Sequence, residues 1–445
     1  MTAFLLRTRP VATRRARGVN YIDVFEEESA NTASIAFTLE DEPSRRGHRR
    51  LAHRRWSAIP APAVDLLWLA VGSFITDKVA SRVATADRWT RDLTLEHPRA
   101  IDWSAAEPIA ERALSFVSGD HWELRASRRR PRGLEVRPVE ADVVCLFSGG
   151  LDSLIGAIDL LERSPDRCVL LAAVRDSRTS VARQTELFGR LHDVYGERVA
   201  LARMSVQVRR PAPAQERPLP AAAENTTRAR SLLFIAWGLA LAAAVGPEVP
   251  LHMPENGLIG INVPLIASRS GSASTRTTHP HFMALIAQLR QALGIANRVE
   301  NPFRLMTKGE AAEQCANRVL LDAVARRSIS CAHPARTRNR SCGWCYPCLI
   351  RRASLARVGL DTAGDYELDV LTASAFVNDE GTRADTLRAL VRALAARPSS
   401  VAVLRNGSLP SGEATAFADV HARGMAEVGV FLSGATDRAL QARFA

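Results

Sequence analysis

Six consecutive residues combine glycines with side chains that can contact phosphate. They are Ser148, Gly149, Gly150, Leu151, Asp152 and Ser153. Without a Cβ atom, the glycines let the backbone turn tightly and approach a ligand closely, while the Asp152 carboxylate suits a site that takes Mg²⁺ together with phosphate. The pattern predicts a phosphate-binding loop, with an ordinary glycine-rich turn as the alternative. A Walker A loop is excluded, because no Gly-Lys-Ser/Thr follows.

Four cysteines form a second candidate site, with the spacing C-x10-C-x2-C-x2-C. They are Cys331, Cys342, Cys345 and Cys348. Four thiolates can surround one tetrahedral Zn²⁺ and leave no position open for water, so the metal would be structural. An iron–sulfur cluster is the competing interpretation, although no further cysteine follows downstream.

Three basic residues are candidates for contacting the phosphates. Arg228 and Arg230 follow a proline-rich segment, and planar guanidinium groups suit phosphate or carboxylate; two surface arginines are the alternative. Lys308 is one of two lysines among 59 lysine and arginine residues. A lysine in such an arginine-rich chain suggests a place that requires a compact point charge.

The flanking residues predict the elements that position these groups. An apolar run at 143–147 is typical of a buried strand, and apolar residues at helical spacing follow from 154 to 163. The loop would then lie at a helix N-terminus, where unpaired N–H groups favour an anion. Further strands are expected at 169–174, 200–206 and 249–253, and further helices at 184–194 and 232–244.

This alternation predicts an α/β fold: a parallel sheet with helices on both faces, and ligands at the carboxyl ends of the strands. Three regions are expected. Residues 1–140 form an α+β extension with a strong helix at 64–83, residues 141–360 form the α/β domain with the four-cysteine site, and residues 361–445 form a helical extension.

Composition limits the class of protein and its partners. The net charge is +12 and the isoelectric point is about 10.2, which favours anionic partners. Nucleic acid is only weakly supported, because a GC-rich genome also produces such an arginine excess. The apolar run at 232–245 is too short to cross a bilayer. Clustered cysteines fit a reducing compartment, so we expect a cytoplasmic protein without membrane contact.

Several motifs together resemble the QueC family, the 7-cyano-7-deazaguanine synthases, which are PP-loop ATP pyrophosphatases. The resemblance covers residues 141–355. It rests on SGGLDS at 148–153, on RQTEL at 183–187, on Lys308-Gly309-Glu310 and on CGWCYPCLIR at 342–351. It implies a PP-loop fold (adenine nucleotide alpha hydrolase-like) and an enzyme that uses Mg²⁺ and ATP. The loop would hold the leaving pyrophosphate while a 7-deazaguanine-type carboxylate is adenylated.

Other segments depart from that family. Its Arg-Asn is replaced by Arg228-Ala229-Arg230-Ser231, and its substrate segment by residues 254–265 and 272–282. These features, with the long N-terminal region, resemble the QatC group of QueC-like proteins of Qat anti-phage defence systems. The resemblance implies a ligase that passes the carboxylate to an amine. The departing segments and the additional N-terminal residues favour a partner protein as the acceptor over ammonia. A plain 7-cyano-7-deazaguanine synthase, a tRNA-modifying enzyme and a non-catalytic ATP-binding scaffold remain alternatives.

Overall fold

The computed structural model describes thirteen segments of the chain: residues 2–9, 19–26, 32–41, 57–83, 85–127, 133–136, 140–175, 178–209, 228–265, 276–332, 340–372, 384–395 and 400–435. Two stretches considered above lie outside these residues. They are residues 210–227 of the proline-rich segment before Arg228, and residues 272–275 of the segment at 272–282.

Five parallel strands form the part of the sheet that carries the loop. In spatial order they are β12 (Val299–Glu300), β11 (Leu251–His252), β8 (Val143–Leu146), β9 (Val169–Arg175) and β10 (Val199–Arg209). The helices that alternate with them are α3 (Leu151–Glu162), α4 (Arg178–Tyr195) and α5 (Arg230–Val245). The predicted α/β fold with a parallel sheet is confirmed.

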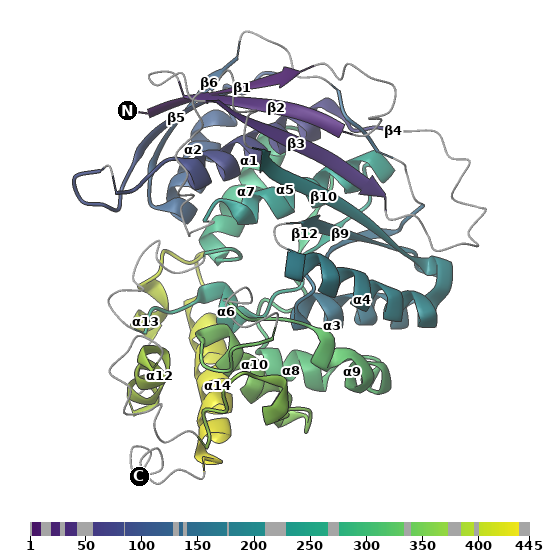
Figure 1. Ribbon diagram of the computed structural model, residues 1–445, viewed down its shortest axis with the longest axis vertical. Coiled ribbons are helices and arrows are strands. Elements are labelled where there is room, and N and C mark those ends of the chain that lie inside the picture. The colour runs from purple at the N-terminus through teal and green to yellow at the C-terminus, as the bar shows by residue number, and fades with distance from the viewer. Residues whose placement is uncertain are drawn as a thin grey trace.

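The side chains of β8 explain why helices cover both faces of the sheet. Successive residues of a strand point to opposite faces. Val144 and Leu146 pack into one core with α5, α1 (Ala61–Val79), α2 (Glu107–Ser118) and α7 (Pro280–Ala292). Val143 and Cys145 pack into a second core with α3 and α4. Figure 1 shows α1, α5 and α7 above β9 and β12, and α3 and α4 below them.

The N-terminal strands continue the same sheet. β3 (Thr32–Asp41) pairs antiparallel with β10, followed by β2 (Val19–Glu26) and β1 (Thr2–Arg9). β5 (Asp92–His97) and β6 (His121–Ala126) then add parallel to β1, which completes a ten-stranded sheet. β4 (Ser57–Ala58) and β7 (Glu135–Val136) form a separate pair. The predicted α+β content of this region is present, and its sheet runs across the expected boundary at 140.

Helix α5 is apolar on all sides, and eleven of its residues are buried. It corresponds to the apolar run at 232–245, and it packs against α1 and the parallel strands. Among the described helices, none is both long enough and apolar enough to span a bilayer.

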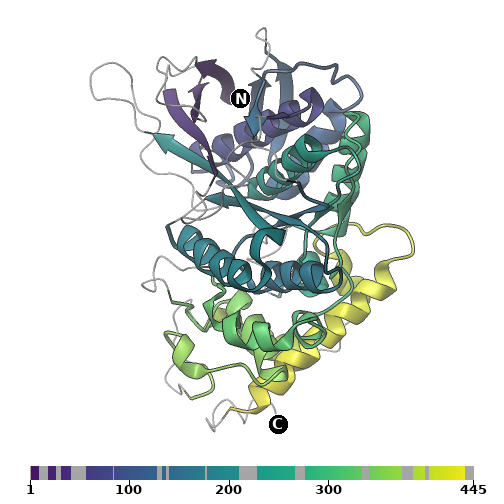
Figure 2. The ribbon, with the colours of Figure 1, turned by 90° about the vertical axis from the view of Figure 1, so that its right-hand side faces the viewer.

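A mainly helical layer lies below the sheet in Figure 1. It comprises α6 (Gly257–Ile261), α8 (Lys308–Glu313), α9 (Arg318–Val324), α10 (Tyr346–Arg357), α12 (Asp385–Ala395), α13 (Ser400–Leu404) and α14 (Ala414–Ser433). Short 3-10 turns occur at Gly196–Arg198, Ala325–Arg327 and Ala363–Asp365. α6, α10, α12 and α14 share one core, so the region after residue 360 packs directly onto the domain before it. Figure 2 shows α14 running diagonally along this layer.

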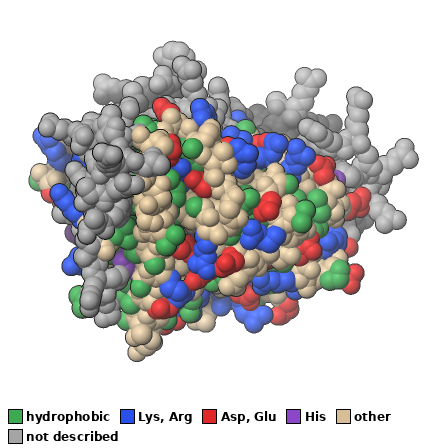
Figure 3. Space-filling model, turned by 90° about the horizontal axis from the view of Figure 1, so that it is seen from below, with side chains coloured by type: hydrophobic (Ala, Val, Ile, Leu, Met, Phe, Trp, Pro, Cys, Tyr) green, Lys and Arg blue, Asp and Glu red, His purple; other side chains and the backbone are tan. Residues whose placement is uncertain are grey.

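The lower end of the molecule carries charges of both signs. Lysine and arginine side chains are interspersed with aspartate and glutamate on the face seen in Figure 3. This face therefore presents a mixed surface rather than a continuous basic one.

Candidate functional site

The loop at 148–153 joins the carboxyl end of β8 to the first turn of α3, as predicted. Gly149 has a φ of +83°, a backbone conformation that residues with a Cβ rarely adopt. The Gly150 N–H donates to Ser148 Oγ at 3.2 Å, and Ser153 Oγ donates to the Gly150 carbonyl at 2.9 Å. Ser148 is exposed. The six residues thus form a tight turn at the N-terminus of a twelve-residue helix, open to solvent at Ser148.

Gln184 of α4 supports the backbone of the loop. Gln184 Nε2 donates to the carbonyl oxygens of Val174, at 3.2 Å, and Ser148, at 3.5 Å. Arg203 of β10 donates to Gln184 Oε1 at 3.1 Å, and both side chains are buried. Gln184 lies in the RQTEL motif, so that motif supports the loop through a buried amide.

The Asp152 carboxylate lies between a lysine and an amide from distant segments. Lys308 Nζ, at the start of α8, is 2.7 Å from Asp152 Oδ1. Asn256 Nδ2 donates to Asp152 Oδ2 at 2.7 Å. All three side chains are buried: 8% of Asp152 and 5% of Lys308 is exposed, and none of Asn256. The structure therefore brings together two residues predicted from the sequence and one that was not predicted.

Asn256 is placed by two local features. Its Oδ1 accepts the Ile259 N–H at 3.1 Å and so caps α6. A Cβ on Gly156, one turn after Asp152, would lie 2.5 Å from the Pro254 side chain. Only glycine lets the segment before α6 approach α3 this closely. An asparagine before Gly-Leu-Ile is an N-cap signal, but it does not identify Asp152 as the partner.

Glu255, next to Asn256, adds a second carboxyl group to the site. Burial and, secondly, the nearby Asp152 charge raise its pKa to about 7, against the opposing effects of Lys308 and Arg230. Part of the residue is accessible to solvent. The site thus combines two carboxyl groups with two cationic side chains.

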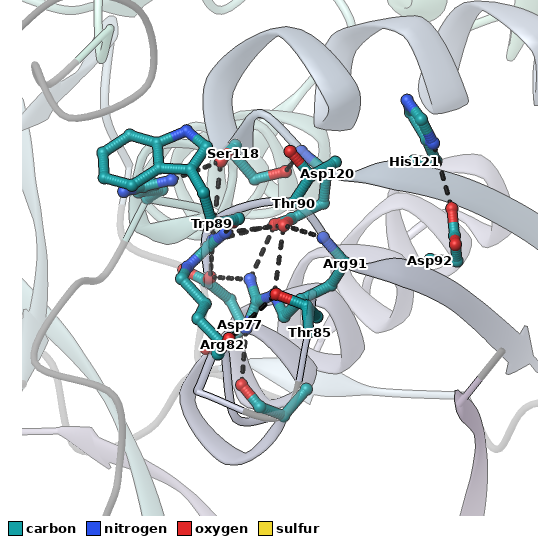
Figure 4. Close-up of polar contacts among 12 residues, drawn as sticks. Asp77, Arg82, Thr85, Trp89, Thr90, Arg91, Asp92, Ser118, Asp120 and His121 are labelled. Carbon is teal, nitrogen blue, oxygen red and sulfur yellow. Dashed lines mark hydrogen bonds and ion pairs between the residues drawn. The ribbon is translucent and has the colours of Figure 1, made fainter. Parts of the chain in front are cut away.

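The two candidate arginines lie in different surroundings. The Arg230 charge lowers the pKa of Glu255, so it acts electrostatically at the site, and its guanidinium lies 4.8 Å from the centre of the Phe234 ring. Arg228 donates to the Ser118 carbonyl at 2.7 Å and lies 4.5 Å from the centre of the Trp89 ring. Ser118 and Trp89 are labelled in Figure 4. Burial, followed by the charge of Arg82, lowers the pKa of Arg228 to about 10. A catalytic role for either arginine stays a prediction.

The four predicted cysteines converge on one point. The Sγ atoms of Cys331, Cys342, Cys345 and Cys348 all lie within 4.8 Å of one another. The Cys342 N–H donates to Cys331 Sγ at 3.4 Å, and the Cys345 N–H donates to Cys342 Sγ at 3.3 Å. Gly343 has a φ of +91°, and a Cβ there would lie 2.1 Å from the Leu368 carbonyl oxygen. This group could hold a metal ion such as zinc.

The cysteine group and the loop are connected through a short segment. Arg351 of α10 donates to Ser328 Oγ at 2.6 Å and to the Ala325 carbonyl at 2.7 Å. The next residue, Ile329, donates its N–H to the Gly149 carbonyl at 3.0 Å. Arg351 is the last residue of the CGWCYPCLIR motif. The helix that carries Cys348 therefore supports the loop from the side.

Comparison of the chain with protein-family models, with curated proteins and with solved structures found no match. A tight turn with two glycines, a helix N-terminus and a carboxylate beside a lysine suit an anionic ligand that is bound together with a divalent cation.

Proposed function

We propose that this protein is a QueC-like, ATP-dependent adenylate-forming enzyme. The observation that carries the proposal is the Asp152 carboxylate held between Lys308 and Asn256 at the N-terminus of α3, beside the Gly149-Gly150 turn. Backbone N–H groups and a lysine can bind phosphate oxygens. Asp152 would hold Mg²⁺, which neutralises charge on the phosphate oxygens when it is bound.

In this mechanism the loop binds the departing pyrophosphate. A carboxylate oxygen of the substrate attacks the α-phosphorus of ATP, and the bond from the α-phosphorus to the oxygen bridging to the β-phosphorus breaks. Negative charge builds up on the β- and γ-phosphates, where Lys308 and the N–H groups of the loop and helix can stabilise it. An amine then attacks the acyl carbon of the adenylate and gives up a proton to solvent. The bond from that carbon to the bridging oxygen breaks, and AMP leaves with this oxygen.

We propose a 7-deazaguanine-type carboxylate as the substrate and an amine of a partner protein in an anti-phage defence system as the acceptor, in the cytoplasm. The resemblance of the motifs to QueC-like proteins supports the substrate. The departures at 254–265 and 272–282 support a larger acceptor than ammonia, because these segments replace the substrate segment of that family.

Zinc is the metal we propose for the four-cysteine group. Four thiolate ligands leave no open position, so its role would be to fix residues 331–348 and with them α10. Replacing Cys342 with serine should lower the zinc content toward zero and strongly destabilise the protein, since structural zinc contributes on the order of 10 kcal/mol in small peptides. Elemental analysis and thermal unfolding measure both effects. Iron in the purified wild-type protein would contradict the assignment.

Pyrophosphate release tests the enzymatic proposal. Purified protein is incubated with Mg²⁺, ATP and 7-carboxy-7-deazaguanine, with ammonium in one arm and a co-expressed partner protein in another. We expect release that depends on the carboxylate, and an added mass on the partner by mass spectrometry. Efficient nitrile formation with ammonium and no protein adduct would indicate a plain synthase. ATP binding without release in any arm would favour a scaffold.

A further inference from the structure

The C-terminal helix α14 packs closely against the segment that carries Asn256 and against the helix that carries Lys308. A Cβ on Gly424 of α14 would lie 2.6 Å from the Leu258 side chain of α6. A Cβ on Gly257 of α6 would lie 2.9 Å from Val420 of α14. Such close approaches leave little freedom for the two helices to shift relative to each other.

Glu427 of α14 contacts the residues on either side of Lys308. Thr307 Oγ1 donates to Glu427 Oε1, and the Gly309 N–H donates to Glu427 Oε2 at 3.3 Å. A Cβ on Gly309 would lie 2.6 Å from Glu427 Oε1, so the close contact depends on glycine. Only 7% of the Glu427 side chain is exposed. A buried carboxylate from the end of the chain thus brackets the lysine of the site.

Further contacts from α14 and α10 fix the same first turn of α8. Thr307 and Glu310 form a capping box at its start. Arg423, one turn before Glu427 on α14, donates to Glu310 Oε1 at 2.7 Å. Arg357 of α10 donates to Glu427 Oε1 at 2.8 Å. Lys308 is the first residue of a turn in which α14 contacts the cap Thr307, the N–H of Gly309 and the side chain of Glu310.

We propose that Glu427 is a positioning residue that sets Lys308 against Asp152, so that the C-terminal helix completes the nucleotide site. The role in turnover rests on the proposed function, whereas the placement of Lys308 does not. A lysine side chain has four rotatable bonds, so it does not fix the position of its ammonium group by itself. Its 2.7 Å approach to Asp152 depends on where α8 begins, and Glu427 contacts α8 at that point.

The presence of only two lysines allows a direct test. Protein grown on lysine labelled with ¹³C at the ε-carbon gives one NMR signal each for Lys78 and Lys308, assigned with Lys308→Arg. We expect Glu427→Ala to move the Lys308 signal and leave the Lys78 signal in place, with Glu427→Gln giving a smaller shift. The matched control is Glu413→Gln, at the start of the same helix, where the carboxylate pairs with Arg304 instead of α8. It should move neither signal.

Turnover provides the second measurement. Because misplacement by about 1 Å can cost 10²-fold, we expect Glu427→Ala to lower kcat for pyrophosphate release at least about tenfold, with Glu413→Gln near wild type. An unmoved Lys308 signal would overturn the proposal, and so would a moved signal with unchanged turnover. If the wild type releases no pyrophosphate, the proposed function fails, and a moved signal would still support the placement of Lys308 by Glu427.

Discussion

Two clusters in this molecule pair aspartates with basic side chains at nearly the same distance, yet they have different surroundings. The N-terminal cluster comprises Asp77, Arg82, Arg91 and Asp120 (Figure 4). Its shortest contacts, Arg82 to Asp120 and Arg91 to both aspartates, are 2.6 Å. The loop cluster comprises Asp152, Asn256 and Lys308, with a 2.7 Å ion pair.

The side chains of the N-terminal cluster also form hydrogen bonds with backbone groups of the protein. Arg91 also donates to the backbone carbonyls of Asp77 and Ala80, and Arg82 donates to the carbonyl of Trp89. Asp77 accepts the Ala229 N–H at 3.1 Å. Both arginines are at most 5% exposed. These contacts tie the end of α1 to the starts of β5, β6 and α5, so the cluster joins the N-terminal region to the α/β domain.

The side chains of the loop cluster are also buried, but the cluster adjoins the turn at 148–150. Its carboxylate lies at a helix N-terminus, beside a turn that requires glycine and next to the exposed Ser148. The comparison shows that a short ion pair does not identify a binding site. An adjoining turn that is exposed at Ser148, and nearby backbone N–H groups without helical partners, distinguish the loop cluster from the N-terminal cluster.

The largest expected effect comes from breaking the N-terminal cluster. Asp120→Asn leaves Arg82 and Arg91 buried with one compensating carboxylate, which should lower the free energy of unfolding by about 3–5 kcal/mol. Chemical denaturation measures it. The control is Asp92→Asn, whose partner His121 is exposed, and the loss there should stay below about 1 kcal/mol. Activity per folded molecule should not change, and a selective loss of activity in Asp120→Asn would contradict a structural role.

Asp152→Asn should, in contrast, lower the activity of each folded molecule. Loss of the carboxylate that we assign to Mg²⁺ should reduce pyrophosphate release about 100-fold or more, equivalent to about 2.7 kcal/mol. Because the buried Lys308 loses its partner, the variant should also lose stability, and release is therefore measured per folded molecule. Undiminished release by this variant would remove the assignment of Asp152.

Lys308→Arg tests whether the loop cluster needs a compact charge. The longer planar guanidinium does not fit the buried place of an ammonium, so kcat/KM should fall about tenfold, or about 1.4 kcal/mol. Lys78→Arg is the matched control, since Lys78 contacts the ring of Phe74 instead of the loop. Equal kinetics for the two variants would mean that the site requires only a positive charge, or none.

The smallest expected effect is a difference in pH dependence between the N-terminal cluster and Glu255, which lies next to the loop cluster. Burial raises the pKa of Asp120, but Arg91 and Arg82 outweigh it and lower that pKa overall, so Asp120 stays charged between pH 5 and 8. The pKa of Glu255 is raised to about 7. The folded protein therefore holds this proton more tightly than the unfolded chain, and stability falls as the pH rises through 7.

Glu255→Gln should remove that dependence. With a discount for the partial exposure of the residue, the variant should gain about 1 kcal/mol over wild type at pH 8 relative to pH 5. Denaturation at the two pH values measures the difference. The same offset at both values would show that Glu255 does not titrate in this range.

The sequence alone was sufficient where neighbouring residues determine the conformation. An apolar strand, two glycines and a helical repeat specify the loop at 148–153, because each acts over a few residues of backbone. The spacing of the last three cysteines likewise brings their sulfur atoms together within one turn and the start of α10. The rare lysine at 308 was identified from composition.

Tertiary structure alone decided which distant residues meet. Asn256 and Lys308 reach Asp152 because the order of the parallel strands places their segments beside α3, and Glu427 reaches α8 because α14 folds back onto it. Arg228 lies two residues before Arg230 yet contacts Ser118 and Trp89, because it precedes the helix that Arg230 begins. Local spacing sets the direction of a side chain, but the packing of sheet and helices sets what lies in that direction.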